Sequence, residues 1–434
     1  MRSLSSAQWR LVRSMGLCLA VVAAVAAIAR PTAPAEPARP GAPDPAAASA
    51  RNSRPAAAPQ RLPALGLAAE GLTVSGLSSG GYMAGQYQIA FSSQVAGAAV
   101  LAAGPYGCTR GQVTTAMREC SCPADMAAWL RALPAWTGLG CRVPTPGELA
   151  VRAETALALN RPHLDSPAHL ARHRVWLMQG ERDPVVAPPL VAAAAEVYRQ
   201  AGVPAGALRL RTVAGAGHGQ PEPDAPVACG STASPFLTDC DDIDAAGELL
   251  AWLYAPDGAG LAAAVPPRAA GLRRFDQRPY RRSGAAAPFD GLDDSGWLYV
   301  PAACEPGVAA RGTAAGAGPA CRLHVVFHGC AQGQGFAGPD GQPLGARFVA
   351  GAGYNRWAES NRLVLLYPQV RASTPPPAAA ARGQTYQLNP EGCWDFWGYT
   401  NPDEALSGVF RTFARRDAPQ LAAVKRMVDA LLVR

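Results

Sequence analysis

A serine framed by glycines stands at Gly76-Leu77-Ser78-Ser79-Gly80, which is a G-x-S-x-G pattern. A short β-type run at 72–75 leads into this pattern, and a helix-compatible run at 81–87 follows it. In such a setting the serine occupies a sharp strand-to-helix turn that exposes its hydroxyl, and the glycines permit the strained, closely packed turn. Gly and Ser are common in this chain, so a plain glycine-rich turn is the alternative. We interpret Ser78 as a nucleophile.

A serine nucleophile needs a base, and the base needs an acid that orients it. Asp183 follows the apolar run 174–178, and His218 follows the run 208–213 in a glycine-rich loop. Each of the three residues lies where a strand ends, and their chain order matches that of the α/β-hydrolases. We therefore predict Asp183 as the acid and His218 as the base. An aspartate in this place can also be only a turn former or a helix cap.

Other acids and histidines fit these roles less well. Asp239, Asp241 and Asp242 come after His218 and lie beside Cys240, which makes them weaker candidates for the acid. The remaining histidines with a predicted environment are His163, His169 and His173, in a polar stretch expected at the surface, and His324, within a strand.

Acyl transfer also needs hydrogen-bond donors for the developing oxyanion. The backbone N–H of Ser79, the residue after the nucleophile, supplies one of them. A His-Gly-type loop supplies the other in many hydrolases, and here the segment 327–332 (FHGCAQ) follows the strand-like run 322–327. A turn closed by a disulfide through Cys330 is the alternative interpretation of this segment.

That loop comes after the histidine, whereas in an ordinary α/β-hydrolase it precedes the serine. Moving the segment 296–434 in front of Leu72 restores the usual order of strands. The sequence therefore predicts a circularly permuted α/β-hydrolase with a mostly parallel central sheet flanked by helices. Permuted chains keep their fold because termini lie at the surface, often near each other.

The elements that must position these residues follow from apolar runs and helical periodicity. The sequence predicts strands at 95–103, 174–178, 208–213, 296–300, 322–327 and 363–367, and helices at 245–254, 354–361 and 421–433.

The chain of 434 residues begins with a segment typical of export. Residues 1–29 combine arginines with an apolar run that ends in an A-x-A pattern, which predicts a signal peptide, with an uncleaved anchor as the alternative. Residues 30–62 are rich in Ala and Pro and are interpreted as a linker or pro-segment. Residues 63–434 are interpreted as one catalytic domain with an insertion near 255–290. The net charge of +7 is scattered, so no nucleic-acid surface is expected.

The chain has 11 cysteines, and setting aside Cys18 in the predicted signal peptide leaves an even number. In an exported chain this pattern predicts up to five disulfides. Short intervals make Cys229–Cys240 and Cys304–Cys321 plausible pairs, and the other pairings stay open. Cys120-Ser121-Cys122 lacks the spacing of a zinc site, so no metal is expected.

Several of these stretches together resemble the secreted short-chain poly(3-hydroxybutyrate) depolymerases, a family with a permuted catalytic domain. The matching stretches are 74–92 (VSGLSSGGYMAGQYQIAFS), 102–108 (AAGPYGC), 180–186 (GERDPVV), 214–220 (AGAGHGQ), 325–333 (VVFHGCAQG), 354–369 (YNRWAESNRLVLLYPQ) and 393–399 (CWDFWGY).

The resemblance implies Ser78 as nucleophile, Asp183 as acid, His218 as base, and the N–H groups of Ser79 and Cys330 as oxyanion donors, with no metal or organic cofactor. A polyester-binding enzyme should also expose apolar surface beside its cleft. We expect Trp394, Phe396, Trp397 and Tyr399, with Tyr106, to provide that surface, and core packing is the alternative for these rings. Segments 255–290, 305–320 and 371–383 depart from the family as insertions, and no polymer-adsorbing domain is expected after the last helix.

The expected function is therefore that of a secreted serine esterase, extracellular or periplasmic. It would hydrolyse polyhydroxyalkanoate esters, poly(3-hydroxybutyrate) or its oligomers, through an acyl-enzyme. Feruloyl- or acetyl-type polysaccharide esterase activity is the first alternative, and a non-catalytic surface-binding protein on the same scaffold is the second. We expect a monomer whose partner is the polyester or oligomer substrate, with no nucleic acid and no stable membrane association after cleavage.

Overall fold

A computed structural model describes residues 59–122, 140–254, 260–284, 287–307, 320–374, 386–401 and 412–433. All of them belong to one compact unit, Pro59–Arg434. The predicted signal peptide and all but the last four residues of the predicted linker lie outside the described residues, as do most of the predicted insertions 305–320 and 371–383.

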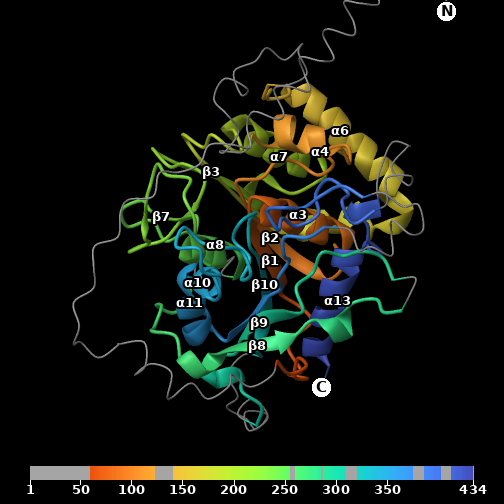
Figure 1. The fold of residues 1–434 in the computed structure, drawn as a ribbon. Helices are drawn as coiled ribbons and strands as arrows, with labels where there is room; N and C mark the ends of the chain where they lie inside the picture. The colour runs from red at the N-terminus through yellow and green to blue at the C-terminus, as the bar shows by residue number, and fades with distance from the viewer. Residues whose placement is uncertain are drawn as a thin grey trace, which may run out of the picture. The chain divides into compact units, whose positions relative to one another are not determined.

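An eight-stranded sheet forms the centre of the fold, in the order β4-β3-β2-β1-β10-β11-β9-β8 (Figure 1). Its strands are β1 (Leu72–Leu77), β2 (Val95–Leu101), β3 (Arg174–Gly180), β4 (Leu208–Val213), β8 (Leu272–Asp276), β9 (Ser295–Tyr299), β10 (Arg322–Phe327) and β11 (Leu363–Tyr367). The pairs from β4 through to β11 are parallel, and β9 and β8 are joined antiparallel at one edge. The predicted mostly parallel α/β sheet is confirmed.

The order of the strands shows the permutation directly. When the chain is followed from β8 to β11 and then from β1 to β4, the strands lie across the sheet in the sequence 1-2-4-3-5-6-7-8, with β1 fifth. The two ends that this reordering joins lie together: Leu65 N–H donates to Leu431 O at 3.3 Å, and Gly66 N–H donates to Val433 O at 2.9 Å. The first described residues therefore lie directly beside the end of the last helix.

Helices cover both faces of the sheet. Figure 1 shows α8 and α11 on one side of the strands and α3 and α13 on the other. Because both faces are covered, β1 and β11 are buried at every position, as the continuous apolar run of β11 leads one to expect. The α-helices of five or more residues in the described part are α3 (Ser79–Ala90), α6 (Pro146–Asn160), α7 (Pro188–Gln200), α8 (Ala245–Tyr254), α10 (Arg347–Gly351), α11 (Tyr354–Asn361) and α13 (Pro419–Leu432).

Local signals in the sequence set where several helices begin. Thr145 and Glu148 form a capping box at the start of α6, and Pro146 takes the first helical position. Pro188 and Pro419 begin α7 and α13 in the same way. These helices therefore start where the sequence satisfies or removes an unpaired backbone donor.

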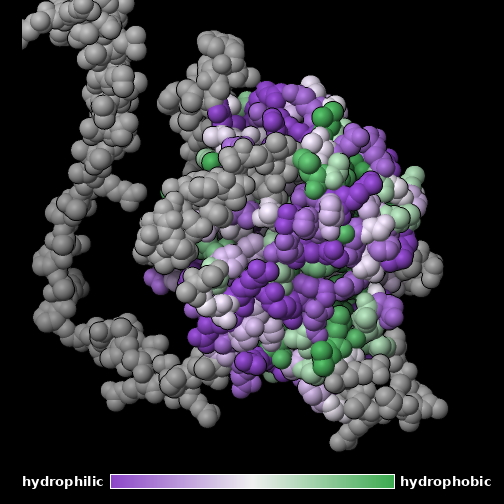
Figure 2. All heavy atoms as spheres, turned by 90° about the vertical axis from the view of Figure 1, so that its right-hand side faces the viewer, coloured by the Kyte–Doolittle hydropathy of each residue, from purple (hydrophilic) through white to green (hydrophobic). Residues whose placement is uncertain are grey.

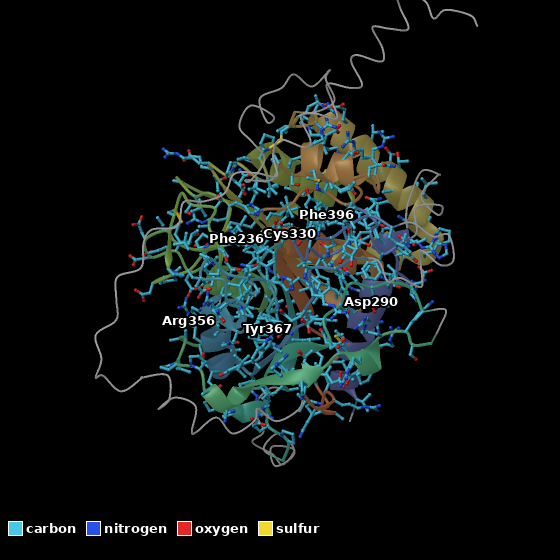
Figure 3. The ribbon with its side chains drawn as sticks, viewed as in Figure 1. Phe236, Asp290, Cys330, Arg356, Tyr367 and Phe396 are labelled. Carbon is cyan, nitrogen blue, oxygen red and sulfur yellow. A yellow bond between two sulfur atoms is a disulfide. The ribbon has the colours of Figure 1, made fainter. Side chains whose placement is uncertain are left out.

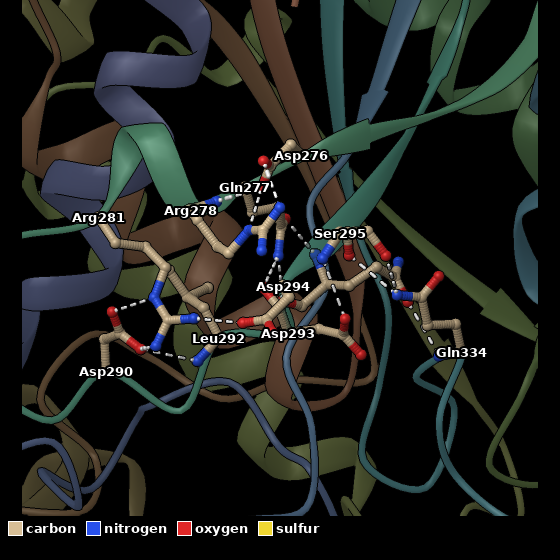
Figure 4. A network of polar contacts seen from close by, with 11 residues as sticks. Asp276, Gln277, Arg278, Arg281, Asp290, Leu292, Asp293, Asp294, Ser295 and Gln334 are labelled. Carbon is tan, nitrogen blue, oxygen red and sulfur yellow. Dashed lines mark hydrogen bonds and ion pairs between the residues drawn. The ribbon is translucent and has the colours of Figure 1, made fainter. Parts of the chain in front are cut away.

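The part of the predicted 255–290 insertion that the structure describes contributes the edge strand β8. Polar contacts fix the chain between β8 and β9 (Figure 4). Arg281 pairs with both carboxylate oxygens of Asp290 at 2.8 Å, and Gln277 Nε2 donates to the carbonyl oxygens of Asp293 and Gln369. This segment is thus part of the sheet assembly.

Five disulfides join the ten cysteines that follow the predicted signal peptide. The predicted pairs Cys229–Cys240 and Cys304–Cys321 are confirmed. The other three, which the sequence left open, are Cys108–Cys120, Cys122–Cys141 and Cys330–Cys393.

One predicted surface residue lies in the interior. His173 is fully buried, with Nε2 at 2.9 Å from Ser92 O and Nδ1 at 3.1 Å from the Gln88 amide. The polar stretch around it, Pro167–Arg172, is a 3-10 helix that ends one residue before His173, and β3 begins one residue after it. Burial accordingly lowers the pKa of His173 to about 4.

The outer surface is mostly polar on the face that carries α6 and α13. Figure 2 shows hydrophilic side chains over most of that face, with hydrophobic ones in smaller groups. Within the residues that the structure describes, no helix has the length and apolar character needed to cross a membrane.

Candidate active site

Ser78 lies at the turn between β1 and α3, as the sequence predicted. Its backbone has φ 58° and ψ −121°, a conformation that L-residues rarely adopt and that marks a strained turn. Its N–H donates to Leu101 O at 2.9 Å, which holds the turn against the end of β2. A Cβ on Gly80 would lie 2.3 Å from Phe327 O, so only glycine lets α3 approach the end of β10 this closely.

Asp183 and His218 form a buried hydrogen-bonded pair beyond the ends of β3 and β4. His218 Nδ1 lies 2.8 Å from Asp183 Oδ2, and both side chains are almost completely buried. The other carboxylate oxygen of Asp183 accepts the N–H groups of Val185 and Val186 at 2.8 and 2.9 Å. Because a carboxylate only accepts, the imidazole must carry its proton on Nδ1, which leaves Nε2 free to accept a proton.

The loops that carry the two residues are bonded to each other and to a small sheet. Arg182 N–H donates to Ala216 O at 2.9 Å, so the acid loop and the base loop are joined directly. The base loop then enters a three-stranded sheet of β5 (Gln220–Pro221), β7 (Leu237–Asp239) and β6 (Val227–Ala228), which the Cys229–Cys240 disulfide closes.

The acid lies near the first turn of the helix that begins beside Ser78. Tyr82 N–H donates to Ser78 O at 3.0 Å. Burial raises the pKa of Tyr82, and the charge of Asp183 acts in the same direction. In the described residues no hydrogen bond links the Ser78 hydroxyl to the His218 ring. Catalytic hydrogen bonds are often long in a protein without substrate and tighten only when substrate binds.

The corner after β10 packs directly against Ser78. A Cβ on Gly329 would lie 3.5 Å from the Cβ of Ser78. Cys330 is bonded to Cys393, and Ala331 N–H donates to Glu391 O at 2.7 Å, so the corner is fixed to the segment that carries the CWDFWGY motif. In the view of Figure 3, Cys330 lies between Phe236 and Phe396. Phe236 packs edge-on against the His218 ring, and Phe396 stacks on Tyr82.

His328 and Gln332 hold this corner in shape. Val370 N–H donates to His328 Nε2 at 3.2 Å, so the ring proton is on Nδ1 and donates to Gly329 O at 2.7 Å. Burial lowers the pKa of His328 to about 4, which keeps the ring neutral. The Gln332 side chain accepts from Gly329 N–H and donates to Pro235 O, next to Phe236.

Two backbone N–H groups beside Ser78 have no hydrogen-bond partner among the described residues. Neither Ser79 N–H nor Cys330 N–H donates a hydrogen bond within the described part of the chain. Ser79 instead uses its hydroxyl to accept Trp394 N–H at 3.3 Å. An unpaired N–H at a helix start and another at a fixed corner can both donate to an oxygen that becomes negative.

The predicted aromatic residues are buried, contrary to the expectation that they form an exposed apolar surface. Trp394 is fully buried against Phe327, Trp397 is 6% exposed, and Tyr106 is 7% exposed and donates to Ala414 O. The rings of the 393–399 segment pack inward where the Cys330–Cys393 bond joins that segment to the corner after β10. The indole N–H groups of Trp394 and Trp397 have no partner in the described residues.

Sequence reasoning missed the polar residues that support the site from behind. They are His328 and Gln332 at the corner, and Glu222, Tyr354 and Arg356 below the base loop. The sequence signal for two of them was weak but present, since Glu222 follows His218 by four residues and Gln332 lies in the predicted oxyanion segment.

The known proteins found to be similar to this chain are named as polyhydroxybutyrate depolymerases. It is 32% identical over 345 residues to "Poly(3-hydroxybutyrate) depolymerase" of Delftia acidovorans, over 79% of this chain and 56% of that protein. It is 28% identical over 320 residues to "Polyhydroxybutyrate depolymerase" of Talaromyces funiculosus, over 72% of this chain and 78% of that protein. The chain therefore aligns with little more than half the length of the Delftia protein. No family model matches it.

Solved structures similar to this chain carry the same kind of name. A PHB depolymerase variant with a serine-to-alanine substitution, complexed with an R3HB trimer, is 25% identical with a TM-score of 0.63, covering 86% of this chain and 99% of that one. The PHB depolymerase from Penicillium funiculosum is 26% identical with the same TM-score and coverage.

Proposed function

Because the chain belongs to the poly(3-hydroxybutyrate) depolymerase family, we propose that it is a secreted serine esterase that hydrolyses poly(3-hydroxybutyrate) or its oligomers. The observation that carries the proposal is the Asp183–His218 pair, bonded at 2.8 Å, at the same sheet edge as the Ser78 turn. The solved relative that was complexed with an R3HB trimer supports 3-hydroxybutyrate oligomers as the substrate class.

In the proposed mechanism the Ser78 hydroxyl attacks the ester carbonyl. His218 Nε2 takes the proton of the hydroxyl and passes it to the leaving alcohol, while Asp183 holds the ring in the Nδ1–H tautomer. Ser79 N–H and Cys330 N–H donate to the oxyanion of the tetrahedral intermediate. A water molecule, activated by the same histidine, then attacks the acyl-enzyme and releases the 3-hydroxy acid. No metal or organic cofactor takes part in these steps.

The substrate contacts proposed beyond the reacting ester are Tyr106, Trp394 and Trp397. All three rings are buried in this structure, so this role requires them to become accessible when substrate binds.

Export, a monomeric state and the absence of stable membrane association belong to the same proposal. The five disulfides support an oxidising compartment, extracellular or periplasmic, because such bonds are rare where thiols are kept reduced.

The test is the turnover of soluble hydroxybutyrate trimer by the wild type and by Ser78→Ala, beside feruloyl esters as a competing substrate class. We expect trimer hydrolysis by the wild type and a loss of at least about a thousandfold in the variant, with an unchanged circular dichroism spectrum. An organophosphate should label one residue, Ser78. Substantial turnover by Ser78→Ala, or a clear preference for feruloyl esters, would refute the proposal.

A further inference from the structure

One helix of the fold contacts both the nucleophile strand and the base loop. The helix is α11, which lies on the opposite face of the sheet from α3 (Figure 1). Its first residue, Tyr354, reaches the strand that ends at Ser78, and its third residue, Arg356, reaches the loop that carries His218.

The contact with the strand is made inside the protein. Tyr354 Oη lies 3.0 Å from Ser75 Oγ, three residues before Ser78. Ser75 Oγ also lies 2.8 Å from His324 Nε2 on the neighbouring strand β10, and the Tyr354 ring stacks on the His324 ring at 5.6 Å. All three side chains are buried. Burial lowers the pKa of His324 to about 3, so this contact is between neutral groups.

The contact with the base loop is made through a buried carboxyl. Glu222 follows His218 by four residues and is 1% exposed. Arg356 Nη2 lies 2.9 Å from its Oε2 atom. Its other oxygen accepts from the Gln220 amide and from Ala246 N–H, both at 3.0 Å. The base loop is thus tied to α11 and to the start of α8 by one side chain.

The turn that begins α11 is shaped to receive that carboxyl. Gly353 has φ +78°, and a Cβ built there would lie 2.0 Å from Glu222 Oε2. Only glycine fits this position, because any side chain would both strain the backbone and displace the carboxyl. Glu222 therefore fits closely against the helix start rather than lying beside it.

In the cluster around Glu222 the carboxyl groups outnumber the guanidinium groups. Arg356 Nη2 also lies 3.0 Å from Asp244 Oδ2, so one guanidinium faces two carboxyls. Burial first, and the charge of Asp244 second, raise the pKa of Glu222 to about 8. The hydroxyls of Tyr354 and Tyr367, whose pKa values burial raises, also face this cluster and stay neutral.

We propose that Tyr354 and Arg356 are positioning residues that set the distance between Ser78 and His218, by holding Ser75 and Glu222 on one turn of α11. This proposal rests on the catalytic roles proposed above for Ser78 and His218. Neither residue touches the substrate. Both act by placing elements that meet at the site, where the described residues show no hydrogen bond between the Ser78 hydroxyl and the His218 ring.

The test compares Arg356→Met with Arg347→Met on soluble hydroxybutyrate trimer. Arg347, on the adjacent helix α10, pairs with the exposed Asp340 and serves as the matched control. We expect Arg356→Met to lower kcat about tenfold to a hundredfold with KM within about twofold, because misplacing catalytic groups by an ångström costs that much. Organophosphate labelling of Ser78 should slow in parallel. Arg347→Met should keep both rates, and Arg356→Lys should recover part of kcat, since it keeps the charge but not the fork of donors.

A milder variant guards against misfolding of Arg356→Met. Tyr354→Phe removes only the hydroxyl that bonds Ser75, and it should lower kcat severalfold while KM stays unchanged. Wild-type kcat and labelling rates in both Tyr354→Phe and Arg356→Met, with Ser78→Ala inactive, would overturn this proposal and leave the proposed function standing. An active Ser78→Ala would instead overturn the proposed function, whatever the α11 variants do.

Discussion

Glu222 is a buried acid whose protonation is coupled to folding. Its pKa is raised from 4.5 to about 8, first by burial and then by the Asp244 charge. Between these two values the folded protein binds a proton that the unfolded chain has released. The free energy of unfolding therefore falls as the pH rises through this window, and the contribution of Glu222 is complete below about pH 4.5 and lost above about pH 8.

Glu222→Gln removes this titration and keeps the shape of the side chain. We expect the variant to be more stable than the wild type at pH 8.5, by on the order of a few kcal/mol, with the difference shrinking toward pH 5. Urea unfolding of both proteins at pH 5, 6.5 and 8.5 measures it. Glu196→Gln, which removes a carboxyl paired with Arg199 at the surface, is the control and should show no such trend. Parallel curves for Glu222→Gln and the wild type would contradict the raised pKa.

At the scale of single residues, the sequence predicted the side chains whose chemical role can be recognised from their neighbours along the chain. Ser78, Asp183 and His218 each follow a strand-like run and could be found one by one. Tyr354, Arg356 and His324 could not, because their partners lie 279, 134 and 249 residues away along the chain. His173 was placed wrongly for a related reason. Its neighbours in sequence are polar, but its neighbours in space are the buried Gln88 and the Ser92 carbonyl.

At the scale of elements, the position of α3 against β10 decides how Ser78 faces the Cys330 corner. A Cβ on Gly80 would lie 2.3 Å from Phe327 O and 2.4 Å from His328 O. Both obstacles are backbone atoms of the corner, so neither can move aside as a flexible side chain would.

Gly80→Ala should therefore push α3 away from the corner. We expect a loss of about 1–3 kcal/mol in the free energy of unfolding and a clear fall in kcat on soluble trimer. Gly147→Ala is the matched control, because its added Cβ would meet nothing within 4 Å in α6. It should raise stability by up to about 1 kcal/mol and leave kcat unchanged. Equal effects of the two substitutions would show that the close approach at Gly80 does not matter.

The long central strands were predictable because strands covered on both faces are continuous apolar runs, as in LVLLY of β11. Several strands without such a run were not predictable. β8 reads LRRFD, lies at the sheet edge, and stands in a stretch that composition marked as an insertion. The two-residue strands β5 and β6 carry too little pattern to be seen. The Cys330–Cys393 pairing, across 63 residues, depends on the sheet order that brings the corner to the CWDFWGY segment.

At the scale of the whole molecule, two halves of the sequence lie side by side in one sheet and meet where β1 pairs with β10. Residues up to Tyr254 supply β1 to β4, and residues from Gly260 supply β8 to β11. Each of the five disulfides lies within one half. The misplaced FHGC segment was enough to predict this arrangement from sequence, because only one reordering gives the oxyanion strand its usual neighbour.

The structure indicates that the permutation can be reversed. The backbone of Gly66 donates to Val433 O at 2.9 Å, so a short linker can join the end of α13 to Leu65. A chain that runs from Gly260 to Val433, through the linker, and from Leu65 to Tyr254 keeps every strand pair of the main sheet and every disulfide. Among the described residues it loses the contacts of Gln60 and Leu62 with the edge of the sheet, at Asp276 and Tyr280, and the core packing of Leu62.

We expect this reordered chain to fold, to show no free thiols, and to hydrolyse trimer with a kcat within about threefold of the wild type, because ends that lie together at the surface tolerate permutation. A second chain with the same linker but opened between Gly329 and Cys330 is the control. It cuts the corner that packs on Ser78 and should fold with little or no turnover. Kinetics on trimer, thiol counting and urea unfolding measure all three proteins. An inactive reordered chain beside an active wild type would contradict this prediction. It would show that the order of the segments along the chain matters to the active site.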